Sequence, residues 1–306
     1  MAHALRFQVI SLPNATWEEM RVRFKYIEDL GFDMVTTGDH FVDWTNPSVP
    51  WLECWTFLAA IARETTRIRL GTYVTQIPLR NPAILARQAL TVDHISNGRL
   101  EVGLGTGLLI DPAYDMIGIP NWDAAERVER FGEYVEIVDR LLSQETTSFD
   151  GTYYTVKAAV MNPRPIQSPR PPIVVAALGS KMLKHAARYA DNWNSLSFAE
   201  EFPDQMAETA DRIKRIDDAC AAIDRDPGSL RRSFLMFDPK SRATGGAITY
   251  YESEDLFRER VHQLIELGIS EIGLYIPAVE EQRPMFEKIA REVIPDLKRQ
   301  YAKAGS

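Results

Sequence analysis

The sequence has little of what marks secreted, membrane-spanning or metal-binding proteins. Only two of its 306 residues are cysteines, Cys54 and Cys220, and their separation matches no metal-binding or redox motif. The longest apolar run, 173–178, spans six residues, whereas a membrane-spanning helix needs about 20. Segment 1–10 contains no apolar run of signal-peptide length. We therefore expect a cytoplasmic protein with free thiols and no membrane partner.

An excess of positive charge is also missing. The chain has 35 lysines and arginines against 43 aspartates and glutamates, a formal net charge of −8. Nucleic acids and anionic membranes attract basic surfaces, so we expect no nucleic-acid partner. A small anionic ligand needs only a few local donors and is compatible with this charge. The apolar share of 45% and the charged share of 25% are those of an ordinary globular protein with a large core.

Short apolar runs alternate with longer amphipathic stretches along the whole chain. We expect strands at 5–10, 33–37, 68–74, 99–104, 173–176, 193–197, 232–237 and 271–276. We expect helices at 17–30, 53–64, 81–95, 124–142, 181–190, 203–223, 253–267 and 283–301. Eight such units fit either a closed barrel or a doubly wound open sheet. The count of eight and the lack of an early G-x-G-x-x-G turn favour an α/β fold of the TIM (β/α)8-barrel type.

The alternation indicates one domain, 1–306, with insertions near 41–52, 144–172 and 238–252. Segment 148–156 has the pattern of a surface β-hairpin around Asp150-Gly151. Five prolines lie between 162 and 172 and indicate an extended connection. We do not interpret this connection as a domain linker, because the alternation resumes directly after it.

In TIM barrels the chemistry lies on the loops that follow the carboxyl ends of the strands. The loop after 33–37 begins Gly38-Asp39-His40-Phe41 and continues to Trp44. A histidine in that position can act as a general acid or base near neutral pH, and Trp44 can form a wall for an aromatic ligand. The alternative is that Asp39 and His40 bond to each other and only support the loop.

Two later loops carry weaker signals. The glycines of Gly103-Leu104-Gly105-Thr106-Gly107 let a backbone approach a flat ligand, although a plain turn explains them equally well. Gly179 and Ser180 precede the helix expected at 181–190, and the free N–H groups of a helix start can bind an anion. The alternative for Ser180 is an ordinary N-cap.

Other catalytic motifs are absent from the sequence. It contains no H-x-x-x-H or H-E-x-x-H metal spacing and no G-x-S-x-G nucleophile turn. The chain therefore offers neither an obvious metal site nor an obvious nucleophile, which points to chemistry supplied by an organic cofactor. A lyase or hydrolase barrel without such a cofactor would need a metal cluster or a Schiff-base lysine at a strand end.

Five segments, taken together and in order, resemble the bacterial luciferase-like monooxygenase family, whose members are flavin- or F420-dependent oxidoreductases. They are Glu28–Asp33 with Gly38-Asp39-His40, Ala59–Ala62 through Thr66–Thr72, Asn81-Pro82-Ala83, Asp93–Leu100 with Gly103–Gly107, and Ala190–Asn194. The resemblance covers most of the chain up to Asn194 and is looser beyond it. It implies a TIM-barrel oxidoreductase that is a homodimer and acts on a small-molecule substrate.

The resemblance also implies a cofactor, either FMN or the deazaflavin coenzyme F420, and residues around it. His40 would exchange the substrate proton and Trp44 would shape the substrate pocket. A non-prolyl cis peptide bond, often found in the F420 branch, would be Tyr73–Val74. The residues that would bind the cofactor are Asp39, Tyr73, Val74 and Thr106 around the ring and Gly179 and Ser180 at the phosphate.

The match to F420 enzymes that oxidise a sugar phosphate is partial. Leu108 stands where that branch carries a catalytic glutamate, and Leu178-Gly179-Ser180 replaces a double glycine. F420 is slightly favoured over FMN. With F420 the protein would be a dehydrogenase or reductase that transfers hydride to or from its substrate, and with FMN it would be a monooxygenase that uses oxygen. A non-catalytic flavin-binding barrel is a further alternative.

Overall fold

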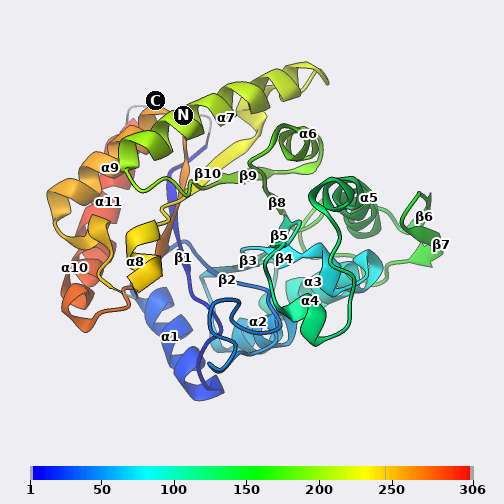
Figure 1. Ribbon diagram of the computed structural model, residues 1–306, viewed down its shortest axis with the longest axis horizontal. Helices are drawn as coiled ribbons and strands as arrows, with labels where there is room; N and C mark the ends of the chain where they lie inside the picture. The colour runs from blue at the N-terminus through cyan, green and yellow to red at the C-terminus, as the bar shows by residue number, and fades with distance from the viewer. Residues whose placement is uncertain (1–2, 245, 304–306) are drawn as a thin grey trace. The chain divides into compact units, whose positions relative to one another are not determined.

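The computed structural model describes residues 3–244 and 246–303, and its chain divides into two compact units. Unit 1 consists of Met1–Ser11, Tyr26–Val35 and Ala177–Ser306, and unit 2 of Leu12–Lys25 and Thr36–Ala176. Strands and helices alternate along the chain in both units, as the sequence predicts (Figure 1). That the units form a single domain stays a prediction.

Unit 1 contains parallel strands paired in the order β1–β11–β10–β9. Its strands are β1 (Arg6–Ile10), β9 (Asn192–Ser195), β10 (Arg231–Leu235) and β11 (Glu271–Tyr275). Its helices are α6 (Ser180–Tyr189), α7 (Phe202–Ala221), α8 (Pro239–Thr244), α9 (Glu254–Glu266), α10 (Arg283–Lys288) and α11 (Ile294–Lys303). A π-helical segment, Ile289–Val293, joins α10 to α11 without a break, so the helix expected at 283–301 is confirmed and contains a π segment in its middle.

Unit 2 contains a second parallel group, in which β5 pairs with β3, β4 and β8. Its strands are β3 (Arg69–Thr72), β4 (Thr75–Gln76), β5 (Leu100–Gly105), β8 (Ile173–Ala176) and the antiparallel pair β6 (Thr146–Asp150) and β7 (Thr155–Val160). Its helices are α2 (Cys54–Glu64), α3 (Pro82–Ser96), α4 (Ala113–Met116) and α5 (Ala124–Ser143). Helix α1 (Trp17–Asp29) and strand β2 (Met34–Thr37) contribute residues to both units.

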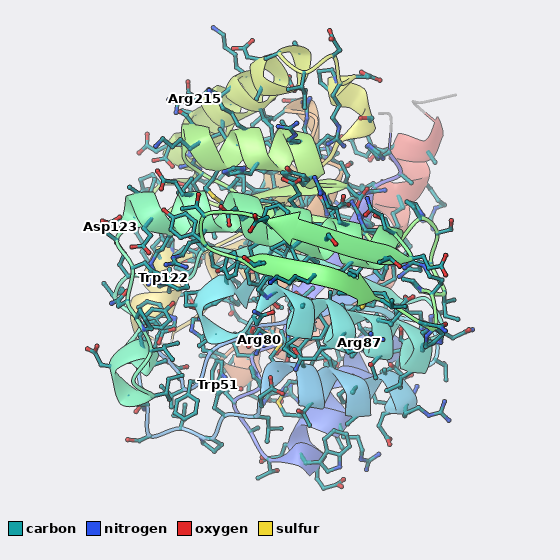
Figure 2. All side chains as sticks on the ribbon, turned by 90° about the vertical axis from the view of Figure 1, so that its right-hand side faces the viewer. Trp51, Arg80, Arg87, Trp122, Asp123 and Arg215 are labelled. Atoms are coloured by element: carbon teal, nitrogen blue, oxygen red, sulfur yellow. The ribbon has the colours of Figure 1, made fainter. Side chains whose placement is uncertain are left out.

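Outside the β6–β7 hairpin, the strands are buried almost continuously rather than on alternate faces. Every residue of β2, β5 and β9 is buried, which is typical of parallel strands covered on both sides. The β6–β7 hairpin confirms the turn expected at Asp150-Gly151. Arg87 of α3 donates to the carbonyl oxygens of Val160 and Asn162 and so holds the end of β7 against the helix (Figure 2).

Helix boundaries follow local capping. The side chain of Asn81 accepts the N–H of Ala83 at 2.9 Å, Pro82 occupies the first turn, and Asn97 ends α3 in the left-handed conformation with φ 56°. Asp123 caps α5 through Ala125 N at 2.8 Å. These short-range rules explain why α3 and α5 lie within a residue or two of their predicted ranges. No helix in the described ranges is long and apolar enough to cross a membrane.

The strand expected at 68–74 is interrupted. Strand β3 ends at Thr72, a non-prolyl cis peptide bond joins Tyr73 to Val74 as the family resemblance implies, and β4 begins at Thr75. The Thr72 hydroxyl donates to the carbonyl of Gly103 at 2.7 Å and accepts its N–H at 3.0 Å. A side chain thus replaces backbone pairing at the point where the strand bends.

Gly103 of β5 is required by this bend. A Cβ at position 103 would lie 1.9 Å from the carbonyl oxygen of Thr72, which is backbone and cannot rotate away. We expect Gly103→Ala to lower the free energy of unfolding by about 1–3 kcal/mol, the usual cost of overpacking. Urea denaturation measures this loss. Gly179→Ala is the control, because a Cβ there meets nothing within 4 Å, and equal stability losses in the two variants would contradict the explanation.

Candidate active site

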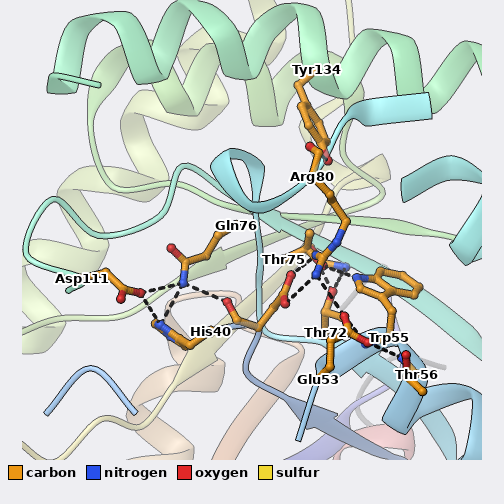
Figure 3. A network of polar contacts seen from close by, with 12 residues as sticks. His40, Glu53, Trp55, Thr56, Thr72, Thr75, Gln76, Arg80, Asp111 and Tyr134 are labelled. Atoms are coloured by element: carbon orange, nitrogen blue, oxygen red, sulfur yellow. Dashed lines mark hydrogen bonds and ion pairs between the residues drawn. The ribbon is translucent and has the colours of Figure 1, made fainter. Parts of the chain in front are cut away.

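His40 lies just beyond the carboxyl end of β2, and its imidazole is bonded to Asp111 (Figure 3). Nδ1 of His40 is 2.6 Å from Oδ2 of Asp111. The other oxygen of Asp111 accepts the backbone N–H of Ala113 at 2.9 Å. Burial of this carboxyl opposes ionisation, but the hydrogen bonds from His40, Gln76 and Ala113 outweigh it and hold the pKa of Asp111 below its ordinary value. Asp111 is therefore an anionic acceptor for the His40 ring.

Gln76 of β4 lies against the same imidazole (Figure 3). Its Nε2 donates to the Asp39 carbonyl at 2.8 Å and to Oδ2 of Asp111 at 3.0 Å, and lies 2.8 Å from Nδ1 of His40. The hydroxyl of Tyr114 donates to the amide oxygen of Gln76. A flipped amide would place its oxygen against two acceptors, so these contacts determine the orientation of Gln76.

The second nitrogen of His40, Nε2, has no hydrogen-bond partner among residues 3–244 and 246–303. The ring of Trp51 meets the imidazole edge-on, with centroids 5.8 Å apart and planes at 88°. Trp51 Nε1 is buried and likewise lacks a partner in this part of the chain. Two adjacent rings thus each have a nitrogen without a hydrogen-bond partner in the described part of the chain.

Three charged residues, Asp39, Arg80 and Glu53, form an ion cluster next to the His40 contacts. Both carboxylate oxygens of Asp39 bond to the guanidinium of Arg80, with one contact at 3.0 Å. Arg80 also donates to Glu53 at 3.2 Å, and Glu53 caps α2 through Thr56 N at 2.7 Å. Burial opposes the charge on Arg80, but Asp39 outweighs it and raises the Arg80 pKa. Asp39 joins this cluster to the His40 contacts, because its carbonyl accepts the Gln76 amide and its carboxylate bonds to Arg80.

The mutual bond between Asp39 and His40 that the sequence suggested is wrong. The carboxylate of Asp39 bonds to Arg80, and the carboxylate on the His40 ring is that of Asp111. A cofactor contact made by Asp39 is not tested by these contacts and stays a prediction.

The other predicted residues of unit 2 follow strand ends. Trp44 is half-buried in the loop after β2, and Tyr73 and Val74 form the half-buried cis peptide between β3 and β4. Thr106 follows β5, and its carbonyl accepts the guanidinium of Arg127 at 2.7 Å. Their roles stay predictions.

Gly179 and Ser180 belong to unit 1. Gly179 is the N-cap of α6 and Ser180 is the first residue of that helix, so the interpretation of Ser180 as an ordinary N-cap is wrong. Both residues are exposed. Arg215 of α7 reaches the Ser180 hydroxyl at 3.5 Å. A helix start with a cation beside it is compatible with the predicted phosphate site.

The sequence interpretation assigned no role in the site to four residues that the structure places around His40 and Asp39: Asp111, Gln76, Arg80 and Trp51. Asp111 is an isolated acid after three apolar residues in the loop beyond β5, and that placement is the one signal that could have singled it out. Gln76 lies in a segment that was interpreted only as the end of a buried strand. Among the described residues, no group of three or more histidine, cysteine, aspartate or glutamate side chains could hold a metal ion.

Known proteins are similar to this chain over most of its length. The F420-dependent glucose-6-phosphate dehydrogenase of Intrasporangium calvum is 27% identical over 312 residues, covering 89% of this chain and 92% of the relative. The enzyme of the same name from Kineococcus radiotolerans is 34% identical over 228 residues, covering 70% and 66%. A solved F420-dependent secondary alcohol dehydrogenase, in complex with an F420–acetone adduct, superposes with a TM-score of 0.78 at 18% identity, covering 95% of this chain and 100% of that one.

The structural likeness confirms the predicted TIM (β/α)8-barrel fold class. A family model described as luciferase-like monooxygenase matches residues 2–271. This chain therefore belongs to the luciferase-like monooxygenase family, a family of oxidoreductases.

Proposed function

We propose that this protein is an F420-dependent oxidoreductase that transfers hydride between the cofactor and a small organic substrate, with His40 exchanging the substrate proton. The names of its relatives support the cofactor. The single observation that carries the proposal is the His40 ring. One nitrogen is bonded to a buried carboxylate, and the other has no partner in the described part of the chain.

The residues around His40 fit a ligand with both polar edges and flat faces. Trp51 Nε1 is a buried donor without a partner in that part of the chain, as expected where a ligand completes the bonding. Strand β5 passes close behind the cis peptide, because a Cβ on Gly105 would lie 2.4 Å from a methyl of Val74. A flat ring resting on Tyr73–Val74 would therefore have a firm support.

Bound F420 would supply the acceptor or donor of a hydride, a pair of electrons with one proton. In the oxidation of an alcohol, His40 Nε2 takes the hydroxyl proton while the hydride leaves the carbinol carbon. In reduction of a carbonyl, Nε2 returns that proton to the new alkoxide oxygen. Proton transfer by a positioned histidine contributes about 10²- to 10⁴-fold to the rate.

Further assignments extend the proposal. Trp44 would shape the substrate pocket, and the homodimer typical of the family would be the functional assembly. The cofactor would be held by Asp39, Tyr73, Val74 and Thr106 at the ring and by Gly179 and Ser180 at the phosphate.

Side-by-side titration with oxidised F420 and with FMN tests the proposal. We expect F420 to bind at least about tenfold more tightly, a difference of about 1.4 kcal/mol, as measured by quenching of cofactor fluorescence. Glucose 6-phosphate and a secondary alcohol, taken from the relatives' names, are the first substrates to add. Preferential binding of FMN with oxygen-dependent turnover would contradict the proposal and favour the monooxygenase alternative.

A further inference from the structure

We infer that Asp111 is the positioning residue of the site, which keeps the proton of neutral His40 on Nδ1 and leaves Nε2 as the atom that exchanges a proton with substrate. The inference rests on the proposed role of His40. It differs from the predicted role of Asp39, whose carboxylate is bonded to Arg80.

The count of donors and acceptors supports this tautomer. The contact of 2.6 Å between Nδ1 and Asp111 needs one proton, and the lowered pKa of Asp111 places that proton on the histidine. Gln76 Nε2 has two hydrogens, and these go to the Asp39 carbonyl and to Asp111. None is left for Nδ1, so the 2.8 Å approach of Gln76 is a contact rather than a donated bond.

The neighbours of Asp111 hold it in this role. Its side chain is fully buried, and its second oxygen is fixed by the N–H of Ala113. Tyr114 orients Gln76, and Arg127 lies over the Tyr114 ring at 4.8 Å. A carboxylate that orients an imidazole through Nδ1 and leaves Nε2 free is the arrangement that makes histidine an effective base in hydrolases. The same reasoning applies here to a proton removed from a hydroxyl.

The tautomer of His40 can be measured without cofactor or substrate. Long-range ¹H–¹⁵N spectra at about pH 8.5, where imidazoles are ordinarily neutral, distinguish a protonated Nδ1 from a protonated Nε2. We expect His40 of the wild type to carry its proton on Nδ1, and Asp111→Asn to show a mixture, because an amide can donate as well as accept. A wild-type His40 with its proton on Nε2 would overturn the inference whatever the cofactor.

Turnover gives the second readout. We expect Asp111→Asn to lower kcat by about 100-fold with unchanged F420 affinity, and Asp111→Glu to restore part of it by restoring a carboxylate. The matched control is Asp93→Asn. Asp93 is equally buried and accepts three hydrogen bonds, from the Ile166 and Gln167 N–H groups and the Gln167 amide, but it lies by the start of β5.

Asp93→Asn should lower stability without changing kcat. Gln167 links Asp93 to Leu100, the first residue of β5, whereas Asp111 follows the opposite end of that strand. Equal losses of kcat in Asp111→Asn and Asp93→Asn would show a structural role only and would overturn the inference. If F420 fails to bind the wild type, the proposed function is wrong, while the tautomer measurement still decides the role of Asp111.

A different observation carries a second inference, about the substrate. The loop that contains Asp111, between β5 and α4, has large exposed apolar side chains. Leu109 is 50% and Ile110 71% exposed, and Phe41, next to His40, is 54% exposed. These side chains are close in sequence to His40 and Asp111, and large exposed apolar side chains near a site can bind a ligand. The guanidinium of Arg127 on α5 donates to the carbonyls of Thr106 and Trp122 and is engaged before any ligand arrives.

We propose that this apolar loop binds the hydrocarbon part of an uncharged alcohol or ketone rather than a sugar phosphate. Methyl spectra of the protein with added ligands test this directly. We expect the Leu109 and Ile110 methyl signals to shift with secondary alcohols, with affinity rising about fourfold per added methylene, as 0.8 kcal/mol of burial predicts. Ile110→Asp should flatten this increase and leave F420 binding unchanged.

Stronger shifts with glucose 6-phosphate than with any alcohol would overturn this second inference. It is also wrong if Ile110→Asp converts a dimer to a monomer in sedimentation without changing alcohol affinity, because the loop is then a contact between two copies of the chain.

Discussion

His40→Asn is expected to lower kcat by about 10²- to 10⁴-fold, the contribution of general acid–base catalysis, while F420 affinity changes by less than about threefold. Asparagine places an amide nitrogen near the position of Nδ1, so the bond to Asp111 can persist. What asparagine lacks is any atom at the position of Nε2. The variant therefore removes proton exchange and little else. Steady-state turnover measures the effect on kcat, with glucose 6-phosphate or the secondary alcohol as substrate, whichever the wild type turns over faster. Titration with F420 measures the effect on cofactor affinity.

His94→Asn is the matched control for this substitution. His94 is half-buried on α3, and its Nε2 bonds to the carbonyl of Arg164 at 2.7 Å. We expect that variant to keep its kcat. A His40→Asn enzyme with wild-type kcat would remove His40 from the mechanism, and loss of F420 binding without a change in kcat at saturation would reassign it to the cofactor site.

Arg80→Met is expected to lower the free energy of unfolding by about 3–5 kcal/mol, the cost of leaving a buried charge without its partner. The side chain of Asp39 is only 2% exposed, and both its oxygens bond to Arg80. Methionine fills similar volume but offers no donor. The Asp39 carboxylate would then be desolvated and unpaired. Equilibrium unfolding in urea measures the loss.

A double-mutant cycle separates the ion pair from packing. Asp39→Asn alone leaves Arg80 with Glu53 as its remaining carboxylate partner. The double variant Asp39→Asn/Arg80→Met removes both charges and should be more stable than Arg80→Met alone, because replacing both members of a buried pair is far less costly than removing one. Strictly additive losses would show that the pair does not act as a unit.

Much of the fold could be predicted because its signals are local. The capping of α3 by Asn81 and Asn97 depends on neighbours in the sequence, and the predicted helix agrees with the structure. The bend after β3 could not be read from the local residues alone, since it requires a glycine at position 103, on the partner strand β5. The π segment at Ile289–Val293 likewise follows no strong local signal. The insertion near 238–252 contains the short helix α8 and a 3-10 helical turn, Thr249–Tyr251, which composition does not mark.

The site, like the fold, could be predicted only where its signals are local in the sequence. His40 could be found because it directly follows a strand, where barrel enzymes carry their chemistry. Its partner could not, because Asp111 is 71 residues away and reaches it only through the fold. Asp39 was paired with the wrong neighbour, since adjacency in sequence says nothing about which way two side chains point. Arg80 and Gln76 were overlooked because a strand end is usually only structural.

The most direct test of the account is the imidazole spectrum of the protein before and after addition of F420. His40 is identified by the signal that disappears in His40→Asn. The account predicts that this signal shifts selectively when F420 binds, while the signals of His94 and His262, which bond to Arg164 and Tyr301, stay in place. Binding of F420 with no change at His40 would show that the cofactor lies elsewhere, and would contradict the central claim that this histidine faces the reacting ring.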